Sequence, residues 1–482
     1  MKRMAEKLIF AYSQKGRQAH TLPEAPPVNF GLPERKILRL PEVSESDVVR
    51  HYTRLSRQNY GVDNGFYPLG SCTMKYNPKI NEQIAAFEEF TGLNPSAPER
   101  AAAGLLKILY ETEQMLCRIF GYARFTLQPA AGAHGEFTGL LIIRAYHLEH
   151  DGGKRRKILI PDAAHGTNPA SCTLAGLQAV TIKSRPDGGV DIDELRRHLD
   201  DTVAGLMLTN PNTLGLFEKN ILAIAELVHN AGGLLYYDGA NANATMGLAR
   251  PADMGFDVCH LNLHKTFATP HGGGGPGSGP VGVTEKLMPY LPRPTIDFNG
   301  QEYFLNHDRP KSIGKVHSFY GNIGVILKAY AYLRLQGSAG LKRASELAVL
   351  NANYVKARLQ KAYAIPYPQI CQHEFVISVK EWKKQYGVSA ADIAKRLMDY
   401  GYHPPTIYFP LNVPECLMIE PTETESKETL DAFCEAMLKI AAEVQSNPEL
   451  VKSAPHSTIV GRLDEARAVK EPDLNYFAGA EN

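Results

Sequence analysis

Six short apolar stretches, separated by polar turns, dominate the middle of this chain. Helical periodicity in Ala101–Phe120 and Gly135–His147 precedes these stretches. A further predicted helix over Ile221–His229, closed by Gly232 and Gly233, falls between the third and the fourth stretch. Strands that alternate with helices predict an α/β fold with a mainly parallel central sheet covered by helices. The predicted strands are Lys157–Pro161, Val180–Lys183, Leu206–Thr209, Leu234–Tyr237, Val258–Leu263 and Val281–Val283.

After Tyr320 the pattern predicts a smaller C-terminal α/β domain. Its last helix has Ser426 as a plausible N-cap. We expect four parts: an extended arm with an active-site loop (1–80), a large domain (81–320), a small domain (321–450) and a tail (451–482). The predicted elements are helices over Ile323–Leu335, Leu341–Tyr363 and Asp392–Tyr400, and strands over Phe375–Val379 and Cys416–Ile419.

Residues 20 to 60 are interrupted by prolines, which favours an extended arm. Such arms often wrap a partner subunit. The prolines are Pro23, Pro26, Pro27, Pro33 and Pro41.

The charge balance gives no long-range attraction to nucleic acid or to an anionic membrane, because 52 Lys and Arg face 51 Asp and Glu. No uninterrupted apolar run is long enough to predict a membrane span. Seven scattered cysteines without a Cys-x-x-Cys pair favour reduced thiols in the cytoplasm over disulfides or a zinc site. They are Cys72, Cys117, Cys172, Cys259, Cys371, Cys416 and Cys434.

Four segments rich in small and polar residues lie at strand ends or before a helix, where α/β sheets bind ligands. Gln128–Gly135 can offer free backbone N–H groups to an anion at a helix start. Pro161–Asn168 carries His165, Thr209–Gly215 carries Asn212, and Tyr237–Asn241 carries Asp238. Singly, each of these side chains could belong to an ordinary loop or turn. Together the segments supply phosphate donors, a side chain that can stack on a ring, a partner for a ligand oxygen, and an acid.

Lys265 supplies the amine that this set needs. It follows a predicted strand, and the glycine-rich run His271–Gly282 comes next. A desolvated lysine beside backbone that a ligand can approach closely is suited to Schiff-base chemistry with a carbonyl cofactor. A surface lysine before a flexible loop is the alternative for this segment alone. With the strand-end set, the pattern predicts a pyridoxal-phosphate site, in which a carboxylate such as Asp238 keeps the ring nitrogen protonated.

Other motifs are weaker. Gly277–Gly282 fits G-x-G-x-x-G, but Pro280 and the following strand are the wrong context for a dinucleotide fold. His147–His150 carries two histidines and a glutamate at a probable helix end. A solvent-exposed helix end explains this segment better than a metal site does, and no metal site is expected.

Five segments resemble the glycine decarboxylase P-protein of the glycine cleavage system. The resemblance extends over most of the chain and is strongest to the C-terminal, lysine-bearing half of single-chain P-proteins. It therefore implies subunit 2, the β subunit, of the two-subunit type. The segments are Pro68–Lys75, Ala131–Glu136, Ala164–Pro169, Asp238–Asn241 and Asn262–Thr266.

The resemblance implies a PLP-dependent transferase-like fold of type I, with pyridoxal 5'-phosphate held as a Schiff base in the large, PLP-binding domain. The implied roles, in this chain's own numbering, are the catalytic amine for Lys265, ring stacking for His165, the ring nitrogen for Asp238, packing beneath the ring for Ala240, the phenolic oxygen for Asn212, and the phosphate for Ala131, Gly132, Ala133 and His264. His134 is a second candidate stacker, better suited to a phosphate or rim role. Thr167, Ser71, Cys72 and Thr73 are further possible active-site residues.

The implied reaction is decarboxylation of glycine with transfer of the aminomethyl group to the lipoyl group of the H-protein. The implied partners are the H-protein and subunit 1 (α), in an α/β hetero-oligomer. Alternatives are another reaction of the same fold, such as a desulfurase with Cys72 as persulfide carrier or an aldolase, and a catalytically silent scaffold. Arg144 and Arg462 are candidates for binding a substrate carboxylate, and the sequence favours neither.

Overall fold

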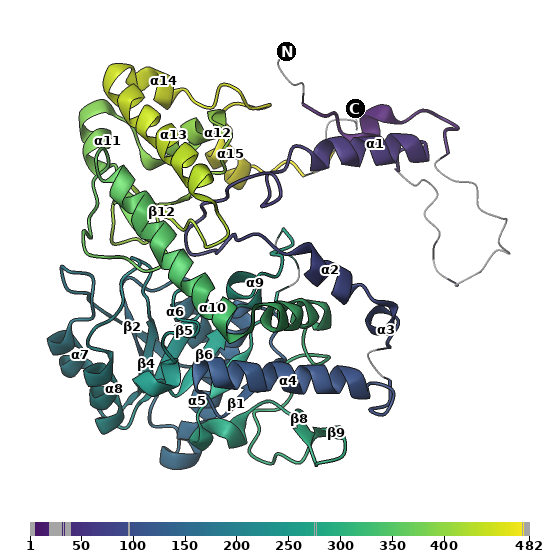
Figure 1. Ribbon diagram of the computed structural model, residues 1–482, viewed down its shortest axis with the longest axis vertical. Coiled ribbons are helices and arrows are strands. Elements are labelled where there is room, and N and C mark those ends of the chain that lie inside the picture. The colour runs from purple at the N-terminus through teal and green to yellow at the C-terminus, as the bar shows by residue number, and fades with distance from the viewer. Residues whose placement is uncertain are drawn as a thin grey trace. The chain divides into compact units, whose positions relative to one another are not determined.

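The computed structural model describes residues 5–18, 31, 33, 40–94, 97–273, 275, 277–474 and 476. The chain forms two compact units, one of residues 1–65 with 453–482 and one of residues 66–452. The four-part division expected from the sequence stays a prediction. Figure 1 shows the elements of each unit.

The larger unit is built on a seven-stranded sheet with the order β1-β7-β6-β5-β4-β2-β3. Every neighbouring pair is parallel except the two that involve β7, which runs antiparallel to β1 and β6. The predicted mainly parallel α/β sheet is confirmed. The strands are β1 (Arg124–Thr126), β2 (Lys157–Pro161), β3 (Gln178–Ile182), β4 (Val203–Thr209), β5 (Leu234–Gly239), β6 (Val258–Leu261) and β7 (Val281–Val283).

The sheet is buried on both faces because successive side chains of a strand point to opposite sides. In β5, Leu235 and Tyr237 belong to one hydrophobic cluster, and Leu234 and Tyr236 belong to another. The helices and 3-10 turns of this part are α2 (Lys79–Ala85), α3 (Glu88–Thr91), α4 (Ala103–Phe120), α5 (Gly132–Asp151), α6 (Thr167–Leu174), α7 (Ile192–His198), α8 (Ile221–Asn230), η2 (Pro251–Met254), α9 (Leu263–Thr266) and η3 (Glu285–Tyr290). A hairpin of β8 (Thr295–Phe298) and β9 (Tyr303–Asn306) follows.

A second, antiparallel sheet has the order β10-β12-β11 and its own core. We call the part built on the seven-stranded sheet the large layer and the part built on the antiparallel sheet the small layer. The long helix α10 (Ile323–Leu359) contacts α4 of the large layer and α13 of the small layer (Figure 1). It is interrupted at Gly337, whose φ is 57°, between the two predicted helices. The elements are β10 (Phe375–Ser378), β11 (Thr406–Ile407), β12 (Cys416–Ile419), α11 (Lys380–Tyr386), α12 (Ala390–Asp399), α13 (Lys427–Ser446) and α14 (Pro448–Lys452). Ser426 caps α13 as predicted, accepting from the N–H of Thr429 at 3.2 Å.

The extended arm predicted for residues 20 to 60 is wrong for Glu45–Ser56, which form helix α1. Ser44 and Asp47 make a reciprocal capping box there: Asp47 N–H donates to Ser44 Oγ at 3.2 Å, and Ser44 N–H donates to Asp47 Oδ2 at 3.3 Å. This local signal overrides the proline pattern upstream. Pro23, Pro26 and Pro27 lie outside the described residues. The same unit holds η1 (Ile9–Tyr12) and α15 (Glu465–Lys470).

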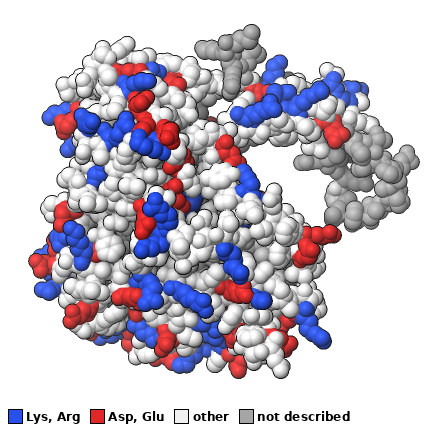
Figure 2. Space-filling model, viewed as in Figure 1, with Lys and Arg blue, Asp and Glu red and all other residues white. Residues whose placement is uncertain are grey.

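No helix among the described residues is long and apolar enough to cross a membrane. On the face in view, Figure 2 shows acidic and basic side chains interspersed, as the formal net charge of +1 leads one to expect.

Gly205 in β4 provides a test of this packing. A Cβ at this glycine would lie 2.2 Å from the carbonyl oxygen of Leu234 on β5. We expect Gly205→Ala to lower the free energy of unfolding by about 1–3 kcal/mol, because the backbone must shift to relieve the clash. Urea denaturation measures the change. Gly104→Ala in α4 is the matched control, since nothing lies within 4 Å of its added methyl group and alanine favours a helix. A loss of stability in both variants would contradict the prediction.

Candidate functional site

A pocket of about 220 Å³ lies at the carboxyl ends of the parallel strands. The register explains its place: Asp238 at the end of β5 pairs with Thr209 of β4 and with His260 of β6, so the residues after these strands converge. The pocket is lined by Ser71, Gly132, Ala133, Glu136, His165, Thr167, Thr209, Pro211, Thr213, Asp238, Ala240, Asn241, Asn262, His264, Lys265, His373 and Glu374.

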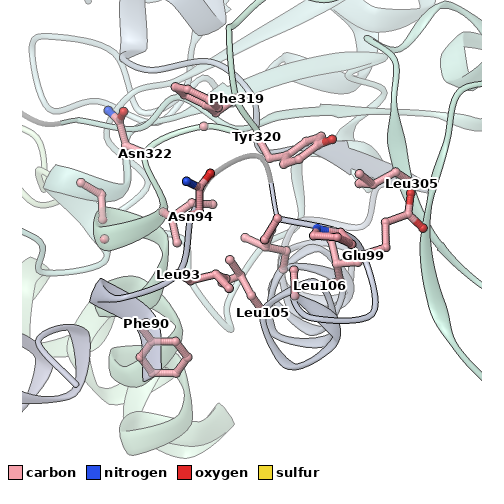
Figure 3. Close-up of a pocket in the computed structure, with 18 of the residues that line it drawn as sticks. Phe90, Leu93, Asn94, Glu99, Leu105, Leu106, Leu305, Phe319, Tyr320 and Asn322 are labelled. Carbon is pink, nitrogen blue, oxygen red and sulfur yellow. The ribbon is translucent and has the colours of Figure 1, made fainter. Parts of the chain in front are cut away.

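A larger cavity of about 830 Å³ lies elsewhere in the same unit. Figure 3 shows its wall of apolar side chains, including Leu105, Leu106 and Phe319. Glu99 and Lys328 are the charged residues that line it. It lacks a set of nucleophiles, acids and bases, so the smaller pocket is the candidate active site.

Lys265 lies on the one-turn helix α9, four residues after Leu261, the last residue of β6. The sequence predicted a longer strand here, up to Leu263. The helical turn is held by the carbonyl of Asn262, which accepts from the N–H groups of Lys265 and Thr266 at 3.1 and 3.3 Å. The side chain of Lys265 is half-buried and lines the pocket.

Asp238 is the buried acid of the pocket, with 3% of its surface exposed. Its carboxylate accepts from the Asn168 amide at 3.0 Å and from Ala240 N–H at 3.1 Å, and lies 3.3 Å from His260 Nε2. Burial acts to raise the pKa of Asp238, but His260 and these two hydrogen bonds outweigh it and lower the pKa below its ordinary value. The carboxylate therefore stays ionised.

The start of α5 forms another wall. Gly132 and Ala133 line the pocket there, and a Cβ at Gly132 would lie 2.3 Å from Asn262 Oδ1. This close approach requires glycine. Asn262 Oδ1 is buried and has no hydrogen-bond partner among the described residues. The first turn of a helix offers free N–H groups to an anion, and the absence of a capping side chain at Ala131 leaves them uncovered.

His264, beside this wall, accepts from Ser278 N–H at 3.3 Å. Burial lowers the pKa of His264 to about 3, and the neighbouring His271 and Lys265 act in the same direction. The ring is therefore neutral at physiological pH.

His165 and Thr167 line the opposite side. His165 Nδ1 lies 2.8 Å from Thr167 Oγ1, and the hydroxyl of Thr167 donates to Glu136 Oε1 at 2.8 Å. Ser171 donates to the other oxygen of Glu136, also at 2.8 Å. The exposed ring of His165 meets the edge of Phe409 with centroids 5.5 Å apart. Its orientation is thus fixed by a chain of hydrogen bonds to α5.

The loop Ser71–Thr73 completes the pocket. Ser71 and Thr73 have positive φ values of 63° and 51°, which non-glycine residues rarely adopt. Ser71 lines the pocket, whereas Cys72 and Thr73 lie behind it. Burial raises the pKa of the Cys72 thiol, although nearby Lys265 opposes the effect. A raised pKa disfavours the nucleophilic thiolate.

Relatives of this chain share nearly its whole length. It is 60% identical over 477 residues to a protein of Caldanaerobacter subterraneus described as probable glycine dehydrogenase (decarboxylating) subunit 2, covering 97% of this chain and 98% of the relative. A protein of Halalkalibacterium halodurans with the same description is 57% identical, with the same coverage of each chain. The model of the glycine dehydrogenase C-terminal domain matches residues 344–459, and that of class-V aminotransferases matches residues 140–274.

The chain belongs to the family of glycine dehydrogenase (decarboxylating) subunit 2. The predicted resemblance is confirmed.

The fold is also that of a crystal structure of glycine decarboxylase (P-protein) in inhibitor-bound form, with a TM-score of 0.68 at 22% identity over 86% of this chain and 92% of that one. A Lactobacillus brevis glutamate decarboxylase has a TM-score of 0.66 at 13% identity, covering 86% and 95% of the two chains. A cysteine desulfurase from Thermococcus onnurineus reaches 0.61 at 16%, covering 79% and 95%. The predicted type I fold is confirmed for this family member.

Besides Cys72 and Thr73, three further residues expected at the site do not line the pocket: Asn212, Ala131 and His134. Asn212 holds a turn: its Oδ1 accepts from Leu214 N–H and Leu216 N–H at 3.0 and 3.1 Å, and its Nδ2 donates to Gly188 C=O at 2.9 Å. Ala131 is the residue before α5. His134 Nδ1 accepts from Ala130 N–H at 3.1 Å, so the imidazole closes the turn that leads into the helix.

The arginine candidates lie elsewhere. Arg144 on α5 donates to the carbonyl of Ala175 at 3.1 Å and does not line the pocket. Arg462 belongs to the other compact unit, where it donates to Ala454 C=O at 2.8 Å.

Several functional candidates escaped the sequence interpretation. Glu136 and Asn168 lie within or beside segments that were singled out, and only the fold turns them toward the pocket. His373 and Glu374 come from the small layer, more than a hundred residues after Lys265. A histidine and a glutamate directly before a predicted strand were the only available signal. The missed residues in or against the pocket are Glu136, Asn168, Asn241, His260, Asn262, His373, Glu374 and Glu420.

A buried ammonium behind the pocket ties these segments together. Lys75 Nζ donates to Asn243 Oδ1 at 2.6 Å, to Glu423 Oε1 at 2.5 Å and to the carbonyl of Thr266, next to Lys265, at 3.0 Å. Lys75 is 2% exposed. Burial acts to lower its pKa, but the Glu423 carboxylate outweighs it and the pKa is raised, so the ion pair persists.

We expect Lys75→Met to lower the free energy of unfolding by about 3–5 kcal/mol, because it leaves the Glu423 carboxylate buried without its counter-ion. Urea denaturation measures this loss. The double variant Lys75→Met/Glu423→Gln is the control. It should recover part of the stability, since no charge is then stranded. Equal losses in both variants would show that the ion pair contributes nothing.

Proposed function

We propose that Lys265 and Asp238 are the central residues of a site that decarboxylates glycine and passes the aminomethyl group to a lipoylated H-protein. The chain is a subunit of a pyridoxal-phosphate-dependent glycine dehydrogenase. The observation that carries the residue assignment is their arrangement: an amine and a buried, ionised carboxylate line one pocket at the carboxyl ends of β5 and β6.

The residues present fit pyridoxal phosphate. Gly132 leaves space that a side chain would fill, and the buried oxygen of Asn262 has no partner among the described residues. The start of α5 would hold the phosphate, Asp238 the ring nitrogen and Lys265 the aldehyde carbon. His165 is the candidate residue to stack on the cofactor ring, and Ala240 lies beside Asp238. The neutral ring of His264 lies next to the start of α5, where the phosphate would bind.

When bound, pyridoxal phosphate supplies a ring that withdraws the electron pair left when carbon dioxide departs from glycine. Asp238 stays negative at physiological pH and thereby stabilises a positive ring nitrogen. Lys265, when its amine is free, can accept or donate a proton within the pocket. Ser71 and the backbone of its loop cover the pocket on one side and restrict water.

The partner and the compartment are part of the proposal. The description of the relatives as subunit 2 supports a companion subunit 1 in an α/β assembly. The seven cysteines are all free, which supports the cytoplasm as the compartment. The desulfurase alternative finds little support, because Cys72 lies behind the pocket and its thiol has a raised pKa.

Lys265→Ala tests the attachment site. We expect borohydride reduction to fix no cofactor on the peptide that contains residue 265, and the glycine–bicarbonate exchange rate to fall by about a thousandfold or more, because the amine is lost. Mass spectrometry and isotope exchange give the two readouts. Lys183→Ala, at an exposed lysine just after β3, should keep both. A cofactor adduct that survives in Lys265→Ala would refute the assignment.

The carrier is tested separately. With subunit 1 present, labelled bicarbonate should enter glycine only when lipoylated H-protein is added, because the lipoyl disulfide is the proposed acceptor of the aminomethyl group. H-protein without its lipoyl group is the matched control. Exchange that proceeds equally with both forms would exclude the lipoyl transfer while leaving the decarboxylation intact.

A further inference from the structure

Two glutamates face each other behind the loop Ser71–Thr73. Glu374 directly precedes β10 and Glu420 directly follows β12. The antiparallel register pairs Phe375 with Ile419, so the next pair along the ladder is Glu374 with Glu420. Their exposed fractions are 3% and 0%, and a carboxylate oxygen of each lies within 4.8 Å of the other and of a His373 nitrogen.

The two carboxyl groups are hydrogen-bonded unequally. Both oxygens of Glu420 accept: Oε1 from Thr73 Oγ1 at 2.6 Å and Asn241 Nδ2 at 2.9 Å, and Oε2 from Thr73 N–H at 2.9 Å. Among the described residues, Glu374 accepts at Oε2 alone, from Ser71 N–H at 2.7 Å. Three donors favour the charged form of Glu420, whereas Glu374 has an oxygen left that can carry a proton.

We propose that Glu374 carries a proton and Glu420 the charge of a one-proton acid pair that positions the Ser71–Thr73 loop on the open side of the pocket. The pair holds both strained residues of the loop by their N–H groups, at positive φ. Glu374 itself lines the pocket, and Glu420 acts through Thr73 and Asn241. Both are positioning residues, and this role rests on the proposed function of the pocket.

Electrostatics support the assignment. Burial, followed by the charge of Glu420, raises the pKa of Glu374 well above its ordinary value. Burial also raises the pKa of Glu420, but the hydrogen bonds from Thr73 and Asn241 oppose that rise. The titratable groups around the pair are Lys265 on α9, Cys72 on the loop, His271, His373 and Lys75. Burial lowers the pKa of His373 to about 3, so its ring is neutral and supplies no compensating charge. Loss of the shared proton would therefore leave two adjacent buried negative charges that repel each other.

The same cluster of His373, Glu374 and Glu420 could in principle ligate a cation. Both oxygens of Glu420 already face N–H or O–H donors, which point their hydrogens where a metal ion would have to sit. The hydrogen-bond pattern therefore favours a proton.

The shared proton makes the position of the Ser71–Thr73 loop depend on pH. The folded pair keeps its proton to a higher pH than two isolated glutamates would, so the loop is in place at lower pH and is destabilised as the pH rises through the titration of Glu374. The wild-type enzyme should show an alkaline limb in kcat/KM that belongs to this pair.

The test compares Glu374→Gln with Glu420→Gln in the complete two-subunit enzyme, using the pH profile of glycine–bicarbonate exchange. A glutamine at 374 can accept from Ser71 N–H and donate from its amide nitrogen, like a protonated acid. We expect it to lose less activity at neutral pH than Glu420→Gln and to move the alkaline limb upward by about one pH unit or more. A glutamine at 420 must turn its amide nitrogen toward a donor, and we expect a loss of about tenfold or more.

Infrared spectroscopy gives a readout that does not depend on activity. The wild-type minus Glu374→Gln difference should contain the carbonyl band of one protonated carboxylic acid, and Glu435→Gln, at an exposed position of α13, should leave that band in place. Metal analysis should find no cation at stoichiometric level.

The assignment is overturned if Glu374→Gln keeps the wild-type alkaline limb or fails to fold. It is equally overturned if the wild-type minus Glu374→Gln difference spectrum contains no carboxylic acid band. It is also overturned if Glu420→Gln behaves like the wild type, or if a cation is found that is lost in both variants. If the wild-type enzyme shows no glycine exchange while the infrared band is present, the proposed function fails and the acid pair stands.

Discussion

The buried ammonium of Lys75 is the interaction on which the rest of the site depends. Its three hydrogen bonds reach the turn after β5, the helix that carries Lys265 and the loop after β12. Asn243 closes the ring by donating to the other oxygen of Glu423 at 3.1 Å. A buried charge is tolerated only when its donors are paired. The large layer, the small layer and the active-site loop must therefore all be in place together.

Around this ammonium the pocket holds its charges in compensated groups. Asp238 accepts hydrogen bonds from the Asn168 amide and Ala240 N–H, and Glu420 accepts from a set of N–H and O–H donors. Burial lowers the pKa values of His264, His271 and His373, so these rings are neutral. In this setting Lys265 is the amine with access to the pocket, which suits a lysine that must exchange its covalent partner.

The fold alone does not decide the reaction. Decarboxylases and a cysteine desulfurase share this architecture at 13–22% identity. The reaction therefore depends on the residues of the site that the fold carries. In this chain the loop Gly70–Lys75 packs against β12 of the small layer: Gly70 N–H donates to Met418 C=O at 3.2 Å, and a side chain at Gly70 would collide with Met418. The small layer thus shapes one wall of the pocket and adds Glu374 to it.

The sequence predicted six of the seven strands of the large sheet, because short apolar runs with turn residues between them have few other solutions, but it missed the short strand β1. It also predicted that Lys265, Asp238, His165 and Gly132 would meet, because the carboxyl ends of parallel strands share an edge. It did not show that Asn212 makes hydrogen bonds within its own loop, that Lys265 lies on a helical turn, or that Glu374 and Glu420 are neighbours. The glutamate pair depends on hydrogen bonds between residues about three hundred positions apart, such as Ser71 with Glu374. The turns at Asn212 and Lys265 are held by side-chain and carbonyl hydrogen bonds that a hydrophobic pattern does not register. Periodicity reports only what neighbours along the chain do, so contacts across the chain were left to the tertiary structure.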